Sequence, residues 1–217
     1  MGRTGPLLSR DAILNRRQLA LQAGIVVLFL SAATASWGGK FNARLNVGDA
    51  APPWKGLRAV DGTTRSLDDH RDASVVVVAF LCNHCPVASG YEARFKQFVE
   101  DYRERGVAFV GISVSRFPAD SFEKMQQRAA ERQFNFPYLQ DPTQEIGRQY
   151  GATCTPHLFV LDRDRKIAYM GAFDDSPQSA EKVQEAYVKD AVEAILAGRR
   201  VEIRETRQRG CDIDYSP

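Results

Sequence analysis

Two cysteines separated by two residues are the part of this chain best suited to chemistry. Cys82 and Cys85 bracket Asn83 and His84, and they follow directly on the apolar run Val75–Leu81. A buried strand that runs into a helix places the first cysteine at the helix N-terminus, where unpaired N–H groups and the helix dipole favour negative charge. This lowers the pKa of a thiol and populates the thiolate, the form that attacks disulfides. The spacing therefore predicts that Cys82 is an exposed nucleophile and that Cys85, one helical turn deeper, resolves the mixed disulfide.

The segments around this motif predict an α/β domain with three layers. The run Val75–Leu81 is apolar throughout, as is typical of a strand covered on both faces. We expect further strands at 107–114, 157–161 and 166–170, and helices at 87–105, 119–132, 141–150 and from Ser176-Pro177 to Gly198. The segment 57–67, with Asp61-Gly62 at its centre, predicts a hairpin before the first long strand. Together they favour an α/β/α fold with a central mixed sheet and an N-terminal β-hairpin extension.

The aromatic residues of the helix expected at 87–105 recur at helical spacing. This stripe predicts a face that packs on the core rather than a ligand surface; its members are Val87, Tyr91, Phe95, Phe98 and Tyr102.

Composition and the first 40 residues bear on where the protein works. The chain has 217 residues and a net charge of only +2, so its charge gives no reason to expect nucleic-acid binding. Arg16-Arg17 precede the uncharged segment 18–39, and Ala33-Thr34-Ala35 fits a signal-peptidase site. The twin arginines also fit a twin-arginine export signal. We expect residues 1–40 to be a signal peptide, with a retained membrane anchor as the alternative, and an extracytoplasmic location such as the periplasm.

Four stretches carry a family resemblance that spans residues 46 to 198. The chain resembles the thioredoxin-like superfamily, and within it the redoxin branch of AhpC/TSA-type proteins and exported TlpA-like oxidoreductases. The stretches are Val47-Gly48-Asp49-Ala50-Ala51-Pro52, Cys82-Asn83-His84-Cys85-Pro86, Phe136-Pro137-Tyr138-Leu139-Gln140-Asp141 and Tyr150-Gly151-Ala152-Thr153-Cys154-Thr155-Pro156. The expected domain is 46–204, with a C-terminal tail at 205–217.

The resemblance implies a thiol–disulfide oxidoreductase that needs no dissociable cofactor. Its partners would be protein or small-molecule thiols and disulfides, including a redox partner protein. It also implies that Thr155-Pro156 is a cis peptide bond facing the cysteine pair, with the backbone of Thr155 open to a substrate chain. His84 stands where strongly oxidising relatives carry a histidine, and as an imidazolium it would stabilise the Cys82 thiolate and make the disulfide a stronger oxidant.

Two other functions compete with this interpretation. Peroxiredoxins carry Pro-x-x-x-Thr/Ser-x-x-Cys, but Ala79 stands three residues before Cys82 and Cys82 stands three before Cys85. This departure argues against the first alternative, a thiol peroxidase in which Cys82 would reduce hydroperoxides through a sulfenic acid. The second alternative is copper binding and delivery. Soft or borderline ligands suit copper(I), and five such side chains could converge on one site: Cys82, His84, Cys85, Cys154 and His157. The favoured interpretation has no metal.

The remaining polar features have structural interpretations. Four cysteines in an exported protein allow three pairings. If Cys82 and Cys85 form one pair, the other would be Cys154–Cys211. This second disulfide would either fasten the tail to the domain or relay electrons from the active site; the third option is that both thiols stay free. Asp174-Asp175 is expected to form a solvated turn. The strand 75–81 contains no acid, so proton transfer during resolution needs another group.

Overall fold

The central feature of the fold is a seven-stranded mixed sheet. The computed structural model describes residues 1–2 and 39–215. The strand order is β2-β1-β5-β4-β3-β7-β8. The bounds are β1 Leu57–Ala59, β2 Thr64–Arg65, β3 Val75–Phe80, β4 Val107–Ser113, β5 Tyr138–Gln140, β7 His157–Leu161 and β8 Ile167–Gly171.

Strand β3 lies inside the sheet and carries the cysteine motif at its C-terminal end. All six of its residues are buried, and it pairs with β4 in parallel and with β7 antiparallel. Strand β5 is parallel to β4, and the hairpin β1–β2 joins the sheet through antiparallel pairing of β1 with β5. The predicted central mixed sheet with an N-terminal hairpin is confirmed.

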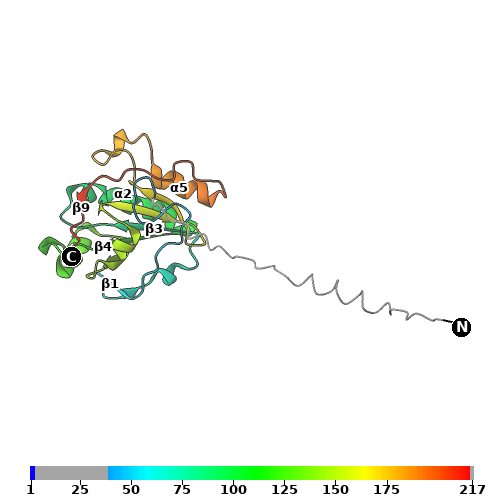
Figure 1. The fold of residues 1–217 in the computed structure, drawn as a ribbon. Coiled ribbons are helices and arrows are strands. Elements are labelled where there is room, and N and C mark those ends of the chain that lie inside the picture. Colours follow the sequence, from blue (N-terminus) through cyan, green and yellow to red (C-terminus); the bar gives the residue numbers. More distant parts are fainter. Residues whose placement is uncertain (3–38, 216–217) are drawn as a thin grey trace. The chain divides into compact units, whose positions relative to one another are not determined.

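Helices cover both faces of the sheet and complete the three layers. α2 Pro86–Tyr102, α3 Phe122–Arg132 and α5 Tyr187–Leu196 contribute to one core, and α4 Glu145–Tyr150 contributes to the other. Figure 1 shows α2 and α5 together on one side of β3. The aromatic stripe of α2 faces the core as predicted, with Tyr91, Phe95, Phe98 and Tyr102 buried and Val87 partly buried. Short 3-10 helices lie at η2 Leu67–His70, η3 Arg103–Arg105, η4 Pro118–Asp120 and η5 Ala180–Lys182.

A second, two-stranded sheet brings the C-terminal segment back to the cysteine motif. β6 Cys154–Thr155 pairs antiparallel with β9 Cys211–Asp212. Figure 1 shows β9 close to the beginning of α2. The Thr155-Pro156 bond between β6 and β7 is cis, as predicted. The segment that the sequence set apart as a tail therefore packs on the domain.

Predicted helices begin later in the structure: the one expected at 119–132 begins at Phe122, and two others differ more. The helix expected from Ser176-Pro177 begins only at Tyr187, because the preceding backbone is engaged in loop hydrogen bonds. Arg94 donates to the carbonyl groups of Ser176 and Pro177 at 2.9 Å. The helix expected from Asp141 begins at Glu145, and the Asp141 carboxylate accepts the N–H of Ile146 at 2.9 Å instead.

The predicted targeting segment falls largely outside the described residues. The interpretation of residues 1–40 as a signal peptide or membrane anchor therefore stays a prediction. Within the described part of the chain, no helix combines the length and apolar character needed to cross a membrane.

Candidate active site

The two cysteines of the motif take different positions from those the sequence predicted. Helix α2 begins at Pro86, so Cys85, and not Cys82, is its N-cap residue, and its Sγ accepts the N–H of Ala88 at 3.4 Å. Pro86 provides the first helical residue without an N–H to satisfy. Cys82 is only 4% exposed and Cys85 is fully buried. The predictions that Cys82 caps the helix and that it is exposed are wrong, because the chain makes a further bend at Asn83-His84 before the helix starts.

Cys82 nevertheless is the sulfur that faces a cavity. A cavity of about 180 Å³ is lined by Cys82 together with His84, Thr155 and Phe117, while Cys85 lies outside its lining. The Sγ of Cys82 lies 2.9 Å from the hydroxyl oxygen of Thr155 and 3.9 Å from Nε2 of His84. A reactant in this cavity therefore meets Cys82 first.

Electrostatics favour the thiolate on the inner sulfur. A hydrogen bond from Cys82 to Cys85, followed by burial, raises the pKa of Cys82, while the hydroxyl of Thr155 opposes this rise. The same bond, together with the N–H of Ala88, lowers the pKa of Cys85. When Cys85 carries the proton, its S–H donates to the carbonyl oxygen of Thr155, 2.9 Å away. The helix N-terminus thus acts on Cys85, the partner thiol, because this residue is the N-cap.

Asp120 is the functional residue that sequence reasoning missed. Its side chain is fully buried, and its carboxylate contacts Nδ1 of His84 at 2.5 Å and accepts the N–H groups of Asn83 and His84. Ser115 donates its hydroxyl to the same carboxylate at 2.6 Å. The acid absent from β3 is therefore supplied by η4, 36 residues further along the chain, and no local pattern in the sequence singles it out.

Cys82, His84 and Asp120 together have the arrangement of a nucleophile, a base and a group that orients the base. The carboxylate of Asp120 requires a proton on Nδ1, and this leaves Nε2 of a neutral ring as an acceptor facing Cys82. The ring of Phe117 stacks on His84 at 4.8 Å, and 28% of the His84 side chain stays exposed. Such an arrangement can remove the proton from a buried thiol.

The five residues considered for copper are not gathered in one place. Within the described chain, three metal-ligating groups come within 4.8 Å of one another only at Cys82, His84 and Asp120. His157 is instead buried in the core, where its ring contacts Phe159, and burial lowers its pKa to about 3. The structure therefore does not form the ligand set that the copper alternative required.

The remaining cysteines do not form the Cys154–Cys211 pair, and their free thiols match the alternative that the sequence left open. All four cysteines lie in the described residues, and each is a free thiol. Cys211 pairs with Thr155 and contacts Cys85, whereas the thiol of Cys154 faces the carbonyl oxygen of Pro156 at 3.8 Å. Neighbouring residues of a strand point to opposite faces, so Cys154 and Thr155 diverge. This geometry favours contact of Cys211 with Cys85 over the predicted Cys154–Cys211 pair.

Two further expectations are corrected. The backbone of Thr155 is not open to a substrate chain, because β9 already pairs with it. Asp174 is not in a solvated turn; it is 4% exposed, accepts the hydroxyl of Tyr91 at 2.7 Å and forms an ion pair with Arg94 at 2.5 Å. The sequence pattern gave no sign of these partners, because both lie about 80 residues earlier, on α2.

Comparison with known proteins agrees with the fold. The model of the AhpC/TSA family matches residues 47–170. A candidate peroxiredoxin of Mycobacterium tuberculosis is 29% identical over 136 residues, which cover 57% of this chain and 83% of the relative.

Solved structures extend the similarity to the thioredoxin-like fold. An uncharacterised conserved protein of Geobacillus kaustophilus is 37% identical with a TM-score of 0.74, and the alignment covers 79% of this chain and 93% of the other. A candidate thiol:disulfide interchange protein of Chlorobium tepidum aligns with a TM-score of 0.57 over 70% of this chain and 99% of its own, at 22% identity. The second likeness concerns the fold alone.

Proposed function

Because the chain belongs to the AhpC/TSA family and is an oxidoreductase with a thioredoxin-like fold, we propose that it is an exported thiol–disulfide oxidoreductase with Cys82 and Cys85 as its redox pair. The observation that carries this proposal is the position of Cys82. Its sulfur faces the cavity beside His84 and Asp120, and Cys85 lies buried behind it. Cys82 can therefore react with a partner while Cys85 stays buried.

The arrangement supports a two-step exchange. Nε2 of His84 takes the proton of Cys82, and the resulting thiolate attacks a disulfide of the partner to form a mixed disulfide. One partner sulfur leaves as a thiolate and takes the proton held by His84, which gives a thiol. Cys85, which lies buried behind Cys82 at the N-cap of α2, then attacks the Cys82 sulfur and releases the second partner thiol. The partner disulfide gains two electrons and the Cys82–Cys85 disulfide forms; the same steps in reverse would oxidise a dithiol partner.

Export is supported by the sequence of the first 40 residues. A short apolar segment after Arg16-Arg17 and before Ala33-Thr34-Ala35 matches the layout of a cleaved signal, and an oxidising compartment permits a stable disulfide. The physiological partner we propose is a protein or small-molecule thiol or disulfide in that compartment.

A thiol peroxidase is a second candidate because one observation favours it. The chain lacks the hydroxyl that peroxiredoxins carry three residues before the cysteine, yet Thr155 brings a hydroxyl to 2.9 Å from the Cys82 sulfur from another element. Relatives named as peroxiredoxins agree with this option. Rapid consumption of hydroperoxide by the reduced protein, lost in Cys82→Ser, would support it.

The test of the main proposal is a redox titration of the full chain against glutathione. Cysteine states are mapped by alkylation and mass spectrometry, and insulin disulfide reduction is measured in parallel. We expect a reversible Cys82–Cys85 disulfide, and loss of insulin reduction in Cys82→Ser but not in the matched control Cys154→Ser. If no 82–85 disulfide forms at any glutathione ratio and the protein does not reduce insulin, the proposal fails.

A further inference from the structure

A third cysteine lies against the proposed redox pair. Cys211, partly buried, packs against a small cluster made by Cys82, Cys85 and Ala88. Its thiol and its backbone N–H lie close enough to the sulfur of Cys85 to help lower the pKa of that thiol, after the larger effect of Cys82. Cys211 therefore reaches the inner sulfur of the pair, which the cavity does not reach.

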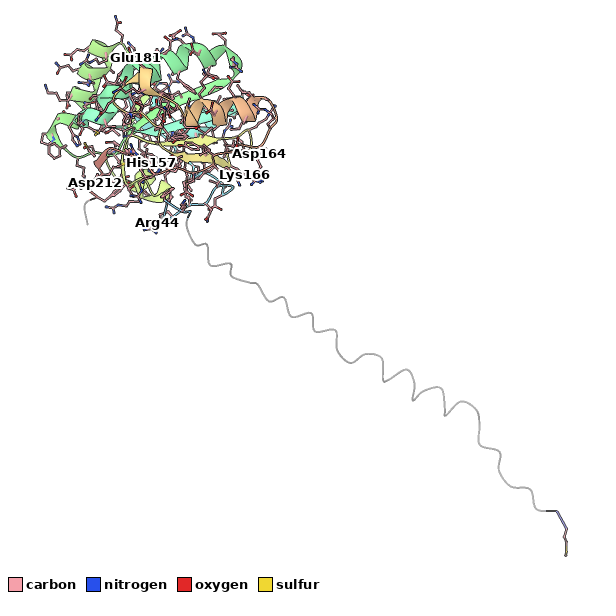
Figure 2. All side chains as sticks on the ribbon, turned by 90° about the horizontal axis from the view of Figure 1, so that it is seen from above. Arg44, His157, Asp164, Lys166, Glu181 and Asp212 are labelled. Carbon is pink, nitrogen blue, oxygen red and sulfur yellow. The ribbon has the colours of Figure 1, made fainter. Side chains whose placement is uncertain are left out.

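The fold holds Cys211 there from two sides. Antiparallel pairing sets Cys211 opposite Thr155, and the carbonyl oxygen of Thr155 lies 2.9 Å from the Cys85 sulfur. Gly210 brings the chain so close that an added Cβ would lie 1.9 Å from the same carbonyl oxygen. Figure 2 places Asp212, the other residue of β9, near the edge of the domain, and its side chain is exposed. The strand thus turns Cys211 inward while its neighbour faces solvent.

The geometry points to Cys211 as a third redox cysteine, which takes over the disulfide of the active-site pair by bonding to Cys85. This inference rests on the proposed function, which forms the Cys82–Cys85 disulfide. The Cys211 thiolate attacks the Cys85 sulfur in the Cys82–Cys85 disulfide, the Cys85–Cys211 bond forms, and Cys82 leaves as a thiolate that takes up the proton lost by Cys211. No electrons enter or leave, because one disulfide replaces another.

This exchange has two consequences. Cys82 is returned to the cavity as a thiol beside His84, ready for another partner, while the oxidising equivalent stays in the protein. The new disulfide also fixes β9 on Thr155, so the backbone edge of β6 remains covered as long as the bond persists.

The experiment uses the full chain with Cys82→Ser, which removes the competing disulfide. The protein is oxidised with glutathione disulfide, quenched in acid, alkylated and digested, and the linked peptides are identified by mass spectrometry. We expect a Cys85–Cys211 linkage in most molecules with Cys154 alkylated, and its complete loss in Cys82→Ser/Cys211→Ser. A Cys154–Cys211 linkage, or Cys211 alkylated while Cys85 carries glutathione, overturns the inference.

A second variant tests the role of the strand position. Gly210→Ala in the Cys82→Ser background should push β9 away from Thr155 and lower the yield of the Cys85–Cys211 linkage at least fivefold. The matched control is Gly90→Ala, because a Cβ there meets its nearest neighbour at an ordinary 3.5 Å. An unchanged yield in Gly210→Ala would contradict the argument.

The two proposals can fail separately. If wild-type protein forms no Cys82–Cys85 disulfide and does not reduce insulin, the proposed function fails, whatever happens at Cys211. If wild-type protein forms the 82–85 disulfide but the Cys82→Ser chain never links Cys85 to Cys211, only the third-cysteine inference fails.

Discussion

Replacing Asp120 by asparagine tests whether His84 acts on Cys82. The carboxylate accepts four hydrogen bonds in the structure, from two backbone N–H groups, the His84 ring and the Ser115 hydroxyl. An asparagine can keep its amide oxygen toward the two backbone N–H groups and place its NH₂ toward His84. That NH₂ donates to Nδ1, so the proton of a neutral ring moves to Nε2, and Nε2 can no longer accept the proton of Cys82.

The expected loss follows from what a positioned base contributes. General acid–base catalysis provides about 10²–10⁴-fold in rate, or about 3–5 kcal/mol in the barrier. The substitution should weaken the two hydrogen bonds from the backbone and replace the two that the carboxylate accepts from His84 and Ser115. We expect this to cost about 2–4 kcal/mol of folding free energy, which leaves a typical domain folded. Asp120→Ala would leave buried donors without partners and is the less informative variant.

The assay measures the rate at which Cys82 reacts with a small aromatic disulfide, in a background with Cys85, Cys154 and Cys211 replaced by serine. The rate is followed from pH 5 to 9, and urea unfolding reports the fold. We expect Asp120→Asn to slow the reaction at least 100-fold near pH 7 and to change the shape of the pH profile. The matched control is Asp72→Asn, whose side chain is 97% exposed. A rate within twofold of the parent, with an unchanged profile, would refute the role of His84 as base.

Other residues give independent predictions. Thr155→Val removes a hydroxyl that lowers the pKa of Cys82, and the loss of about 1.5–3 kcal/mol should slow disulfide attack by Cys82 roughly 10- to 100-fold; a rate equal to wild type would contradict this. His157 is neutral in the folded state because burial lowers its pKa from 6.5 to about 3. Its contribution to the free energy of unfolding is therefore complete above about pH 6.5 and is lost as the pH falls toward 3. The loss amounts to about 2 kcal/mol at pH 5. Wild-type protein should lose about 2 kcal/mol more unfolding free energy between pH 7.5 and pH 5 than His157→Phe does. If the two proteins lose the same amount, His157 does not contribute to the pH dependence. Arg94→Met leaves the buried Asp174 carboxylate without its cation and should cost about 3–5 kcal/mol in urea unfolding; a change below 1 kcal/mol would show that the pair contributes little.

The sequence by itself determined the sheet and the position of the cysteine motif at the end of β3. The uninterrupted apolar run of β3, its Cys-x-x-Cys end and the Thr-Pro before β7 are local patterns, and each is visible within a few residues. Hydrophobic periodicity likewise identified the buried face of α2. These features depend on the backbone and on neighbouring residues, and for that reason they could be predicted.

Only the tertiary structure decided which groups surround the sulfurs. Asp120 meets His84 across 36 residues, and Cys211 meets Cys85 across the pairing of β6 with β9. Such contacts depend on how loops close over the ends of strands, and nothing in the local sequence encodes them. The start of α2 shows that prediction from local sequence can also fail at short range. The bend at Asn83-His84 places the helix N-terminus at Cys85 and not at Cys82, so the helix stabilises the Cys85 thiolate.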